Sequence, residues 1–454
     1  MSDVTEEPTN DVTSGPIART VFKLAMPVVA GMLMEFALAS IDFYWVGRIG
    51  STAQDAVTSS MVVIWTIFAT ISIVSVGVTA LVSRFIGAKD QQKAVYYIRQ
   101  GLMMAAAVSL VFSVFGYIFT PQFLRVMDTS TATMAHAVPY LRIFFASSLL
   151  YFINETCFAV FRASGDTLTP MKIAAIAILL NIGLDPLLIF GWGPIPAMGV
   201  AGASLATAIS VGVGTLLIVG RMLRGKLGYD VGNLFGDTPH VPSFLKIGKI
   251  GLPISVQQFV FVFVYWFLIK IVHRFGEVAA AAMGIGNRME SFSYLTCYGF
   301  SVAASTIVGQ NLGAKQPDRA AKGAWGACGT AIGVTAIISA VFIIFPRQIA
   351  SIFTEDPEVL SIATDYLVIL GISQSAMAIE IVLEGAFGGA GDTIPPMLVA
   401  IPGAVIRVPM AYYLCFNLDW GINGVWWTLT ITSLLKAVVL GAWFGLGRWK
   451  KKEV

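Results

Sequence analysis

The sequence predicts an all-α integral membrane protein of twelve transmembrane helices, arranged as two six-helix bundles related by a pseudo-twofold axis. Three observations support this fold class. Of the 454 residues, 56% are hydrophobic and only 12% are charged, about half the roughly 25% of charged residues in a soluble domain. Apolar runs of about 20 residues, the length needed to cross a bilayer, recur along the chain. The second half also repeats motifs of the first half at a fixed offset.

Twelve apolar runs, joined by short polar connections, define the expected helices. They cover residues 20–46, 58–83, 99–120, 138–161, 170–191, 199–222, 250–273, 278–308, 324–345, 363–387, 395–416 and 423–446. Several runs exceed the minimum length, which permits tilt without fixing its angle. Residues 1–16 are polar and acidic and lack the basic start and cleavage site of a signal peptide. We expect them to form a disordered cytoplasmic tail.

Basic residues predict the orientation of these helices. Lys and Arg gather in the second, fourth, sixth and eighth connections and at residues 448–452, whereas the alternate connections hold few. Basic loops remain on the cytoplasmic side of a membrane. Both termini are therefore predicted to be cytoplasmic, in a multi-pass protein of the cell (inner) membrane. Trp443 and Trp449 fit an interfacial aromatic belt near the end of the last helix.

Four motif pairs recur at an offset of 226 residues, which indicates a duplication. They are marked by Pro27 with Pro253, Gly87 with Gly313, Tyr140 with Tyr366, and SGDTLTPM (164–171) with AGDTIPPM (390–397). After residue 191 the offset falls to about 222, as for Gly199 and Gly421. Since each repeat holds an even number of helices, both halves have the same orientation, and their axis lies along the membrane normal. The predicted N-lobe is 17–225, the cytoplasmic interlobe loop 226–249 and the C-lobe 250–454.

Composition and motifs argue against several classes of function. The net charge of +3 is scattered, so no nucleic-acid partner is expected. The four cysteines have no metal-ligand spacing, and no ATP-binding loop, HExxH motif or Ser/His/Asp arrangement stands out. We therefore expect neither a cofactor nor a bound catalytic metal, and an integral membrane enzyme is the least favoured class.

Motifs along almost the whole chain resemble those of the multidrug and toxic compound extrusion (MATE) family. They are LAMPVVAG, IDFYWVG (41–47), FRASGDTLTPM, NIGLDPLLIFG (181–191), GVAGASLAT (199–207) and VGQNLGAK (308–315). The resemblance implies two six-helix lobes in a V shape. It also implies export of organic, often cationic, compounds driven by inward flow of H⁺ or Na⁺, by a protein expected to function as a monomer.

One position departs from the sodium-driven branch of that family. This branch carries an acidic residue in the seventh helix, where the present chain has Phe261. Asp42, Asn181 and Asp185 instead match the polar cluster of the branch that includes DNA-damage-inducible F (DinF-like) and archaeal members. This departure leaves both H⁺ and Na⁺ open as the coupling ion.

Comparison of equivalent positions in the two halves distinguishes residues that both halves share from charged residues that only one half has. At the fixed offset, Glu35 maps onto Phe261, Asp42 onto Leu268, Glu155 onto Ile381 and Asp185 onto Ala411. These N-half acids have few basic partners at comparable depth, because Arg142, Arg162 and Lys172 fall near helix ends, from which long side chains can reach the interface. Unmatched carboxylates in a membrane must be protonated or hold a cation. The N-half is therefore the expected place of ion coupling.

Asp42 and Asp185, helped by Asn181, form the candidate ion-coupling site. Both carboxylates fall in the outer half of the bilayer, and Asn181 and Asp185 share a helical face at i,i+4 spacing. We expect this site to take a proton or Na⁺, with no other metal in the protein. The alternative is a hydrogen-bonded cluster that only joins the first and fifth helices.

Other polar and proline residues are weaker candidates. Glu35, Glu155 and Asn154 are candidates for coupling or for contact with substrate. In the C-half, charges of both signs predict internal ion pairs, with Glu380 as a competing candidate for substrate contact or a second coupling role. Pro27 is a hinge candidate, since proline removes a backbone donor and weakens the local helix.

The function predicted from these features is secondary active efflux by alternating access. Its substrates are expected to be small organic, often cationic or amphipathic, compounds. A lipid-linked oligosaccharide flippase of the same superfamily is an alternative, but such a protein would line its cavity with arginines for phosphate groups. A dedicated metabolite exporter is also compatible with the sequence, as is a duplicated membrane scaffold without transport.

Overall fold

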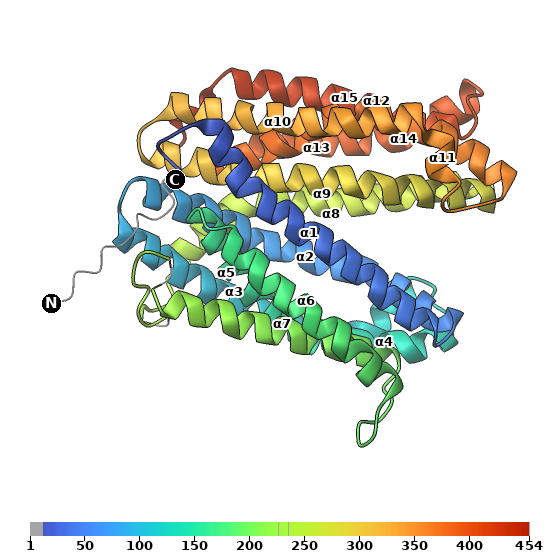
Figure 1. The fold of residues 1–454 in the computed structure, drawn as a ribbon, viewed down its shortest axis with the longest axis horizontal. Coiled ribbons are helices and arrows are strands. Elements are labelled where there is room, and N and C mark those ends of the chain that lie inside the picture. Colours follow the sequence, from blue (N-terminus) through green and yellow to red (C-terminus); the bar gives the residue numbers. More distant parts are fainter. Residues whose placement is uncertain (1–11, 226, 235, 454) are drawn as a thin grey trace. The chain divides into compact units, whose positions relative to one another are not determined.

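The computed structural model describes residues 12–225, 227–234 and 236–453, which form an all-helical chain (Figure 1). The helices are α1 (Ile17–Gly47), α2 (Ser51–Gly87), α3 (Gln91–Val126), α4 (Thr131–Ala146), α5 (Ser148–Ala163), α6 (Leu168–Phe190), α7 (Val200–Leu223), α8 (Val241–His273), α9 (Glu277–Gly313), α10 (Pro317–Ile344), α11 (Pro346–Ala350), α12 (Pro357–Ala390), α13 (Ile394–Val405), α14 (Arg407–Tyr412) and α15 (Asn423–Gly445). A π-helical turn (Tyr413–Asn417) and a 3₁₀ turn (Arg448–Lys451) complete them. Within the described ranges, the β-structure amounts to one isolated bridge, between Trp192 and Ile195.

The membrane spans agree with the predicted fold class. Ten described segments are long and apolar enough to cross a membrane, and the bent pair α4–α5 makes an eleventh. The remaining long helix, α9, has 37 residues and is about 55 Å long at 1.5 Å per residue. It carries Arg288 and Glu290 near its middle, so it is less apolar than the others. With α9 the described chain reaches the twelve spans expected from the sequence.

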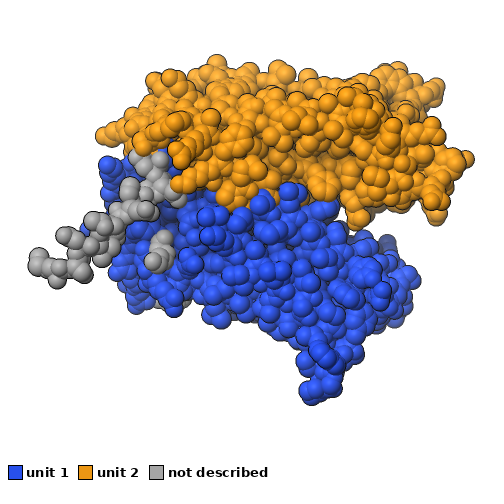
Figure 2. Space-filling view, viewed as in Figure 1, with its two compact units in different colours: residues 1–12, 30–251 blue, residues 13–29, 252–454 orange. Residues whose placement is uncertain are grey.

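The chain divides into two compact units, which Figure 2 shows in different colours. Unit 1 contains residues 30–251 together with Val12, and unit 2 contains residues 13–29 and 252–453. Two helices contribute to both units: α1 changes unit after Val29, and α8 changes unit after Gly251. Both changes occur within two residues of the repeated prolines Pro27 and Pro253.

One predicted span that was expected to be continuous is broken, and another is continuous with one local irregularity. The span at 138–161 consists of α4 and α5, which meet at Ser147 with a bend of 51°. The Ser147 hydroxyl donates to the carbonyls of Ile143 (2.8 Å) and Phe144 (3.1 Å), a type of contact that often bends helices. The span predicted at 395–416 runs from Ile394 to Asn417 as one span, with a local irregularity of the helix at Ile406. Pro409 lies three residues later and cannot donate to the Val405 carbonyl.

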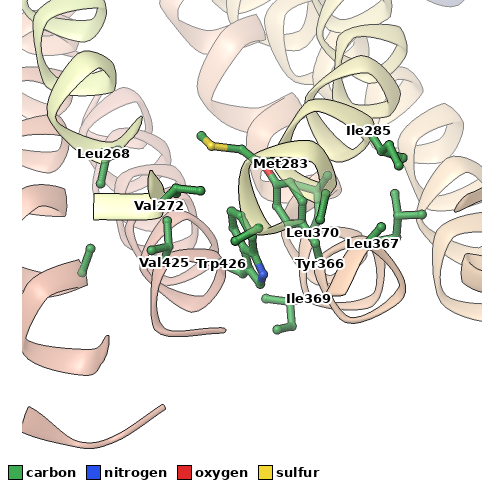
Figure 3. Packing of buried hydrophobic residues seen from close by; sticks show 14 of the residues in the cluster. Leu268, Val272, Met283, Ile285, Tyr366, Leu367, Ile369, Leu370, Val425 and Trp426 are labelled. Atoms are coloured by element: carbon green, nitrogen blue, oxygen red, sulfur yellow. The ribbon is translucent and has the colours of Figure 1, made fainter. Parts of the chain in front are cut away.

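Each unit has its own helix packing and buried core. In unit 1, α3 packs on α2, α4 and α5, and α7 packs on α4, α5 and α6. In unit 2, α12 packs on α9, α10 and α15. Figure 3 shows the large core of unit 2, where the ring of Tyr366 stacks on Trp426 with centroids 4.0 Å apart. Both rings are fully buried, so α12 and α15 are held in one register.

Both ends of the described chain have contacts within unit 2. Arg319 of α10 donates to the backbone carbonyls of Ser14 (2.5 Å) and Gly15 (2.8 Å), so this part of the predicted tail belongs to the folded structure, while residues 1–11 lie outside the described residues. Trp449 is only 1% exposed and stacks on Phe444. The expectation that Trp449 belongs to an interfacial belt is therefore wrong, because the protein itself buries the ring.

Two repeated loops hold a lysine in the left-handed region, which gives a stability prediction. Lys89 (φ 58°) and Lys315 (φ 59°) follow α2 and α9 at equivalent positions, and this conformation costs an L-residue roughly 1–2 kcal/mol. Lys89→Gly should therefore raise the free energy of unfolding by about 0.5–1 kcal/mol, because the relief of strain exceeds the entropic cost of the more flexible glycine backbone. The thermal unfolding midpoint should rise accordingly. Lys322→Gly, within α10, is the control and should cost about 1 kcal/mol. Equal losses in both variants would contradict the prediction.

Candidate functional site

Helices α1 and α6 bring Asp42, Asn181 and Asp185 together in unit 1. Asp42 and Asp185 each lie five residues before the end of their helix, or about 8 Å along it. Asn181 Nδ2 donates to Asp185 Oδ1 at 3.2 Å, and the Asp42 and Asp185 carboxyl groups lie within hydrogen-bonding reach of each other. The three residues predicted as one cluster are therefore close neighbours.

Apolar side chains cover this cluster on one side. Val46 and Ile189, one turn after Asp42 and Asp185, belong to a buried cluster with residues of α2 and α7. Asn181 and Asp185 are themselves 1% and 0% exposed. The carboxyl pair is thus separated from the nearby helix ends by a packed apolar layer, so charge placed there is poorly solvated.

Several oxygen atoms of the cluster have no hydrogen-bond donor among the described residues. They are Asp42 Oδ1, Asn181 Oδ1 and Asp185 Oδ2, and all three are buried. Two ionised carboxylates cannot hydrogen bond to each other, because neither carries a proton. The contact between Asp42 and Asp185 therefore needs a proton on one of them, and the remaining oxygens can accept from a proton donor or coordinate a cation.

Tyr140 and Tyr151 complete the surroundings of this pair, and the sequence analysis did not identify them as site residues. Tyr140 of α4 lies within electrostatic reach of Asp42 and Asp185, and Tyr151 of α5 within reach of Asp42. Ser204 of α7 donates to the Tyr140 carbonyl at 2.9 Å, which fixes the position of this residue. The Tyr151 hydroxyl is buried and has no hydrogen-bond partner among the described residues.

Glu35 and Glu155 form a second acidic group, nearer the middle of the helices. Glu155 pairs with Arg162, seven residues later on α5, and Glu35 lies within electrostatic reach of both. Glu155 is therefore one of the N-half acids that does have a basic partner, and the expectation that Arg162 reaches the interface is wrong. Arg162 is only 8% exposed, because its long side chain reaches back two turns along α5 instead of extending to the interface.

Asn154 precedes Glu155 on α5, and its described hydrogen bond leads to α7. Its Nδ2 donates to Thr215 Oγ1 of α7 at 3.2 Å, and Thr215 Oγ1 also donates to carbonyls of α5 (Leu150) and α7 (Val211). The Asn154 amide thus joins α5 to α7. Its proposed contact with ion or substrate stays a prediction.

Unit 2 holds the mixed charges of the C-half in a separate network. Lys436 of α15 pairs with Glu380 of α12, as the mixture of signs predicted. Gln257 of α8 donates to Glu384 at 2.9 Å, and Glu290 of α9 lies within electrostatic reach of Lys436. The Arg407 guanidinium donates to hydroxyl groups of α15. Each buried cation of this network thus has an internal partner.

No group of three or more His, Cys, Asp or Glu side chains in the described ranges could hold a metal ion. The acidic groups of unit 1 consist of two carboxylates each, with the Asn181 amide beside one pair and Arg162 beside the other. Pro27 lies within α1, which continues through it. The carbonyl of Lys23, four residues earlier, cannot receive the usual helical hydrogen bond there.

Comparison with known proteins agrees with this architecture. The model of the MatE family matches residues 27–187 and again residues 253–413, and the two matches begin 226 residues apart, which confirms the internal repeat. A protein of Thermotoga maritima named "Probable multidrug resistance protein NorM" is 27% identical, over 96% of this chain and 94% of its own. A "FAD transporter" of Shewanella oneidensis is 23% identical, over 94% of each chain.

Solved structures show the same fold at low sequence identity. A MOP superfamily transporter of Pyrococcus furiosus, described as having a binding pocket of reversed polarity, has a TM-score of 0.91 at 22% identity and covers 99% of this chain and 100% of its own. An outward-facing multidrug resistance MATE family transporter gives the same values. With two family matches covering most of its length, the chain belongs to the MatE family, that of the MATE multidrug efflux transporters.

Proposed function

We propose that this protein exports small organic cations in exchange for inward-moving protons, and that Asp42 and Asp185 carry the proton. The single observation that carries the proposal is that the Asp42 and Asp185 carboxyl groups lie within hydrogen-bonding reach of each other, with buried oxygen atoms and without an ion pair to a cation among the described residues. Arg162, a buried cation of unit 1, is paired with Glu155. A buried carboxyl pair has to gain or lose a proton as its exposure to water changes.

A proton explains this geometry more directly than Na⁺ does. The carboxyl–carboxyl hydrogen bond needs one shared proton, whereas Na⁺, a hard cation like Ca²⁺, would need several oxygen ligands around it. Asp42, Asp185 and Asn181 offer three oxygens that lack a donor. Sodium coupling is therefore the second candidate. The assignment to the DinF-like and archaeal branch stays a prediction and bears on the same question.

Coupling requires that the proton favours one conformation over another. We infer that protonation allows α1 and α6 to pack closely at the Asp42–Asp185 contact, and that loss of the proton separates them. Pro27 is the proposed hinge, since α1 belongs to unit 2 before residue 30 and to unit 1 after it. Both termini are proposed to lie in the cytoplasm of the cell in whose inner membrane the protein acts.

The choice of an organic cation rests on charge. The acidic groups of unit 1 are anionic once protons leave, while the buried cations Arg407 and Lys436 of unit 2 have internal partners. An anionic substrate would therefore have to compete with the internal partners of these two cations. Because one relative is named an FAD transporter, a dedicated exporter of an anionic metabolite is the alternative, and FAD is a suitable test compound.

Reconstituted vesicles can separate these possibilities. We expect a pH gradient alone to drive accumulation of a fluorescent organic cation such as ethidium, with no accumulation under a sodium gradient alone at equal pH. FAD should not be moved by either gradient. Accumulation under the sodium gradient alone would replace H⁺ with Na⁺, and transport of FAD but not of the cation would replace the substrate class.

A further inference from the structure

The same short segment follows the last helix of each half, and the transport reaction does not account for it. α7 ends at Leu223 and α15 ends at Gly445. Two residues later each chain segment has a glycine in the left-handed region, Gly225 (φ 67°) and Gly447 (φ 70°). These glycines are 222 residues apart, the offset that already relates Gly199 to Gly421. Duplication has therefore preserved how the sixth spanning helix of each half ends.

A buried apolar side chain follows each glycine by two residues. Leu227 is 4% exposed and Trp449 is 1% exposed. Trp449 stacks on Phe444 with ring centroids 4.5 Å apart, and its Nε1 donates to the Phe444 carbonyl at 2.9 Å. Each segment thus has a buried side chain two residues after its glycine, and Trp449 is packed against its own half.

In unit 1 the segment after α7 then makes hydrogen bonds with two other parts of the unit. Tyr229 and Ser164 share a hydrogen bond between hydroxyl groups at 2.9 Å, directly beside the Gly-Asp-Thr turn at 165–167. Arg99 of α3 donates to the Val231 carbonyl through Nε (3.1 Å) and Nη2 (2.6 Å). The segment therefore connects α7 to the Gly-Asp-Thr turn and to the third spanning helix of its half.

In unit 2 the segment after α15 makes ion pairs with the equivalent two elements of that unit. Lys452 pairs with Asp392 at 3.2 Å, within the second Gly-Asp-Thr turn at 391–393. Lys450 pairs with Asp318 at 2.9 Å, in the first turn of α10, which is the third spanning helix of the second half. The partners differ in chemistry, but the connected elements are the same.

We propose that these segments, residues 225–231 apart from 226 and residues 447–452, are two equivalent latches that fasten the last helix of each half to its Gly-Asp-Thr turn and third helix. The first latch is held by uncharged acceptors and a guanidinium that is about one-fifth exposed. The second is held by lysine–carboxylate pairs in which Asp318 is 87% exposed. Salt screens exposed pairs strongly, so the second latch is sensitive to ionic strength and the first is not.

Hydrogen–deuterium exchange tests the latches independently of transport. Trp449→Ala should speed amide exchange at least tenfold at residues 391–393 and 318–322, while residues 165–167 keep their rate. Leu227→Ala is the matched variant and should speed exchange at 165–167 alone. Raising the salt concentration to about 1 M, where the Debye length is about 3 Å, should speed exchange only at the second latch.

Two further variants distinguish loss of the latch contacts from general misfolding. Lys452→Gln keeps the Trp449 anchor and should speed exchange at 391–393 by severalfold, and the charge swap Lys452→Asp with Asp392→Lys should restore much of the protection. Unchanged exchange in both Trp449→Ala and Lys452→Gln would overturn the proposal, as would equal changes at both Gly-Asp-Thr turns. A protein that exchanges as expected but moves no ethidium would instead count against the proposed function.

Discussion

Asp42→Asn should abolish proton-driven accumulation of organic cations while leaving a folded protein. A gradient of one pH unit is worth about 1.4 kcal/mol for each proton coupled, which sustains a substrate ratio of up to about tenfold per proton. Without an ionisable group at residue 42 the ratio should stay near one. Substrate uptake into vesicles under an imposed pH gradient, with the membrane potential clamped at zero, measures this ratio.

The folded state of this variant should be at least as stable as that of the wild type. The introduced amide can donate a hydrogen bond to Asp185, whose Oδ2 has no donor among the described residues, and one costly buried carboxyl group is removed. Asp55→Asn, an exposed position at the start of α2, is the matched control and should transport normally. Normal accumulation by Asp42→Asn would exclude Asp42 as the coupling residue.

Asp185→Asn should have the same effect, and the double variant should be no worse than either single change. In the proposed function the two neighbouring carboxyl groups hold one proton between them, so removing either group removes the binding site of that proton. Residues that act as a unit give non-additive losses. If each single variant kept a ratio clearly above one and the double variant lost it, each carboxyl group would bind its own ion.

The sequence was sufficient to predict the architecture, because apolar length and repetition are direct physical signals. Every backbone N–H and C=O group inside a membrane must find its hydrogen-bond partner within the protein. A long apolar run that crosses the membrane therefore forms a helix. The bend at Ser147 was missed because serine is common in spanning helices, and only the tertiary surroundings decide whether a helix bends there. Contacts of the latches were also missed, because Gly225 and Gly447 lie outside the strongest repeated motifs.

The site was predicted in part, and the reason lies in which residues the repeat preserves. Asp42 and Asp185 could be identified because the other half lacks acids at the equivalent positions. Tyr140 was overlooked because it recurs as Tyr366, which marked it as scaffold, although Tyr366 bonds to Asn287 at 3.2 Å and Tyr140 lies beside the carboxyl pair. The Glu155–Arg162 pair was overlooked because helical ion pairs are usually sought three or four residues apart.

Lys436→Met should destabilise unit 2 more than any other change considered for it. The variant leaves the Glu380 carboxyl group, whose side chain is 15% exposed, without its cation, and breaking a buried pair in this way costs about 3–5 kcal/mol. For a bundle of this size we expect a fall on the order of 10 °C in the unfolding midpoint. Thermal unfolding of the purified protein in detergent measures the shift.

Two comparisons distinguish loss of the ion pair from loss of packing. Adding Glu380→Gln to Lys436→Met should recover most of the stability, because an uncharged pair of similar volume no longer buries an isolated charge. Lys93→Met, which breaks the exposed pair with Asp90, should shift the midpoint little, since such pairs contribute about 0–1 kcal/mol. If the double variant were as unstable as Lys436→Met, the cost would come from the lysine stem packed on Gly403, and the charge of Glu380 would then be free for a role in transport.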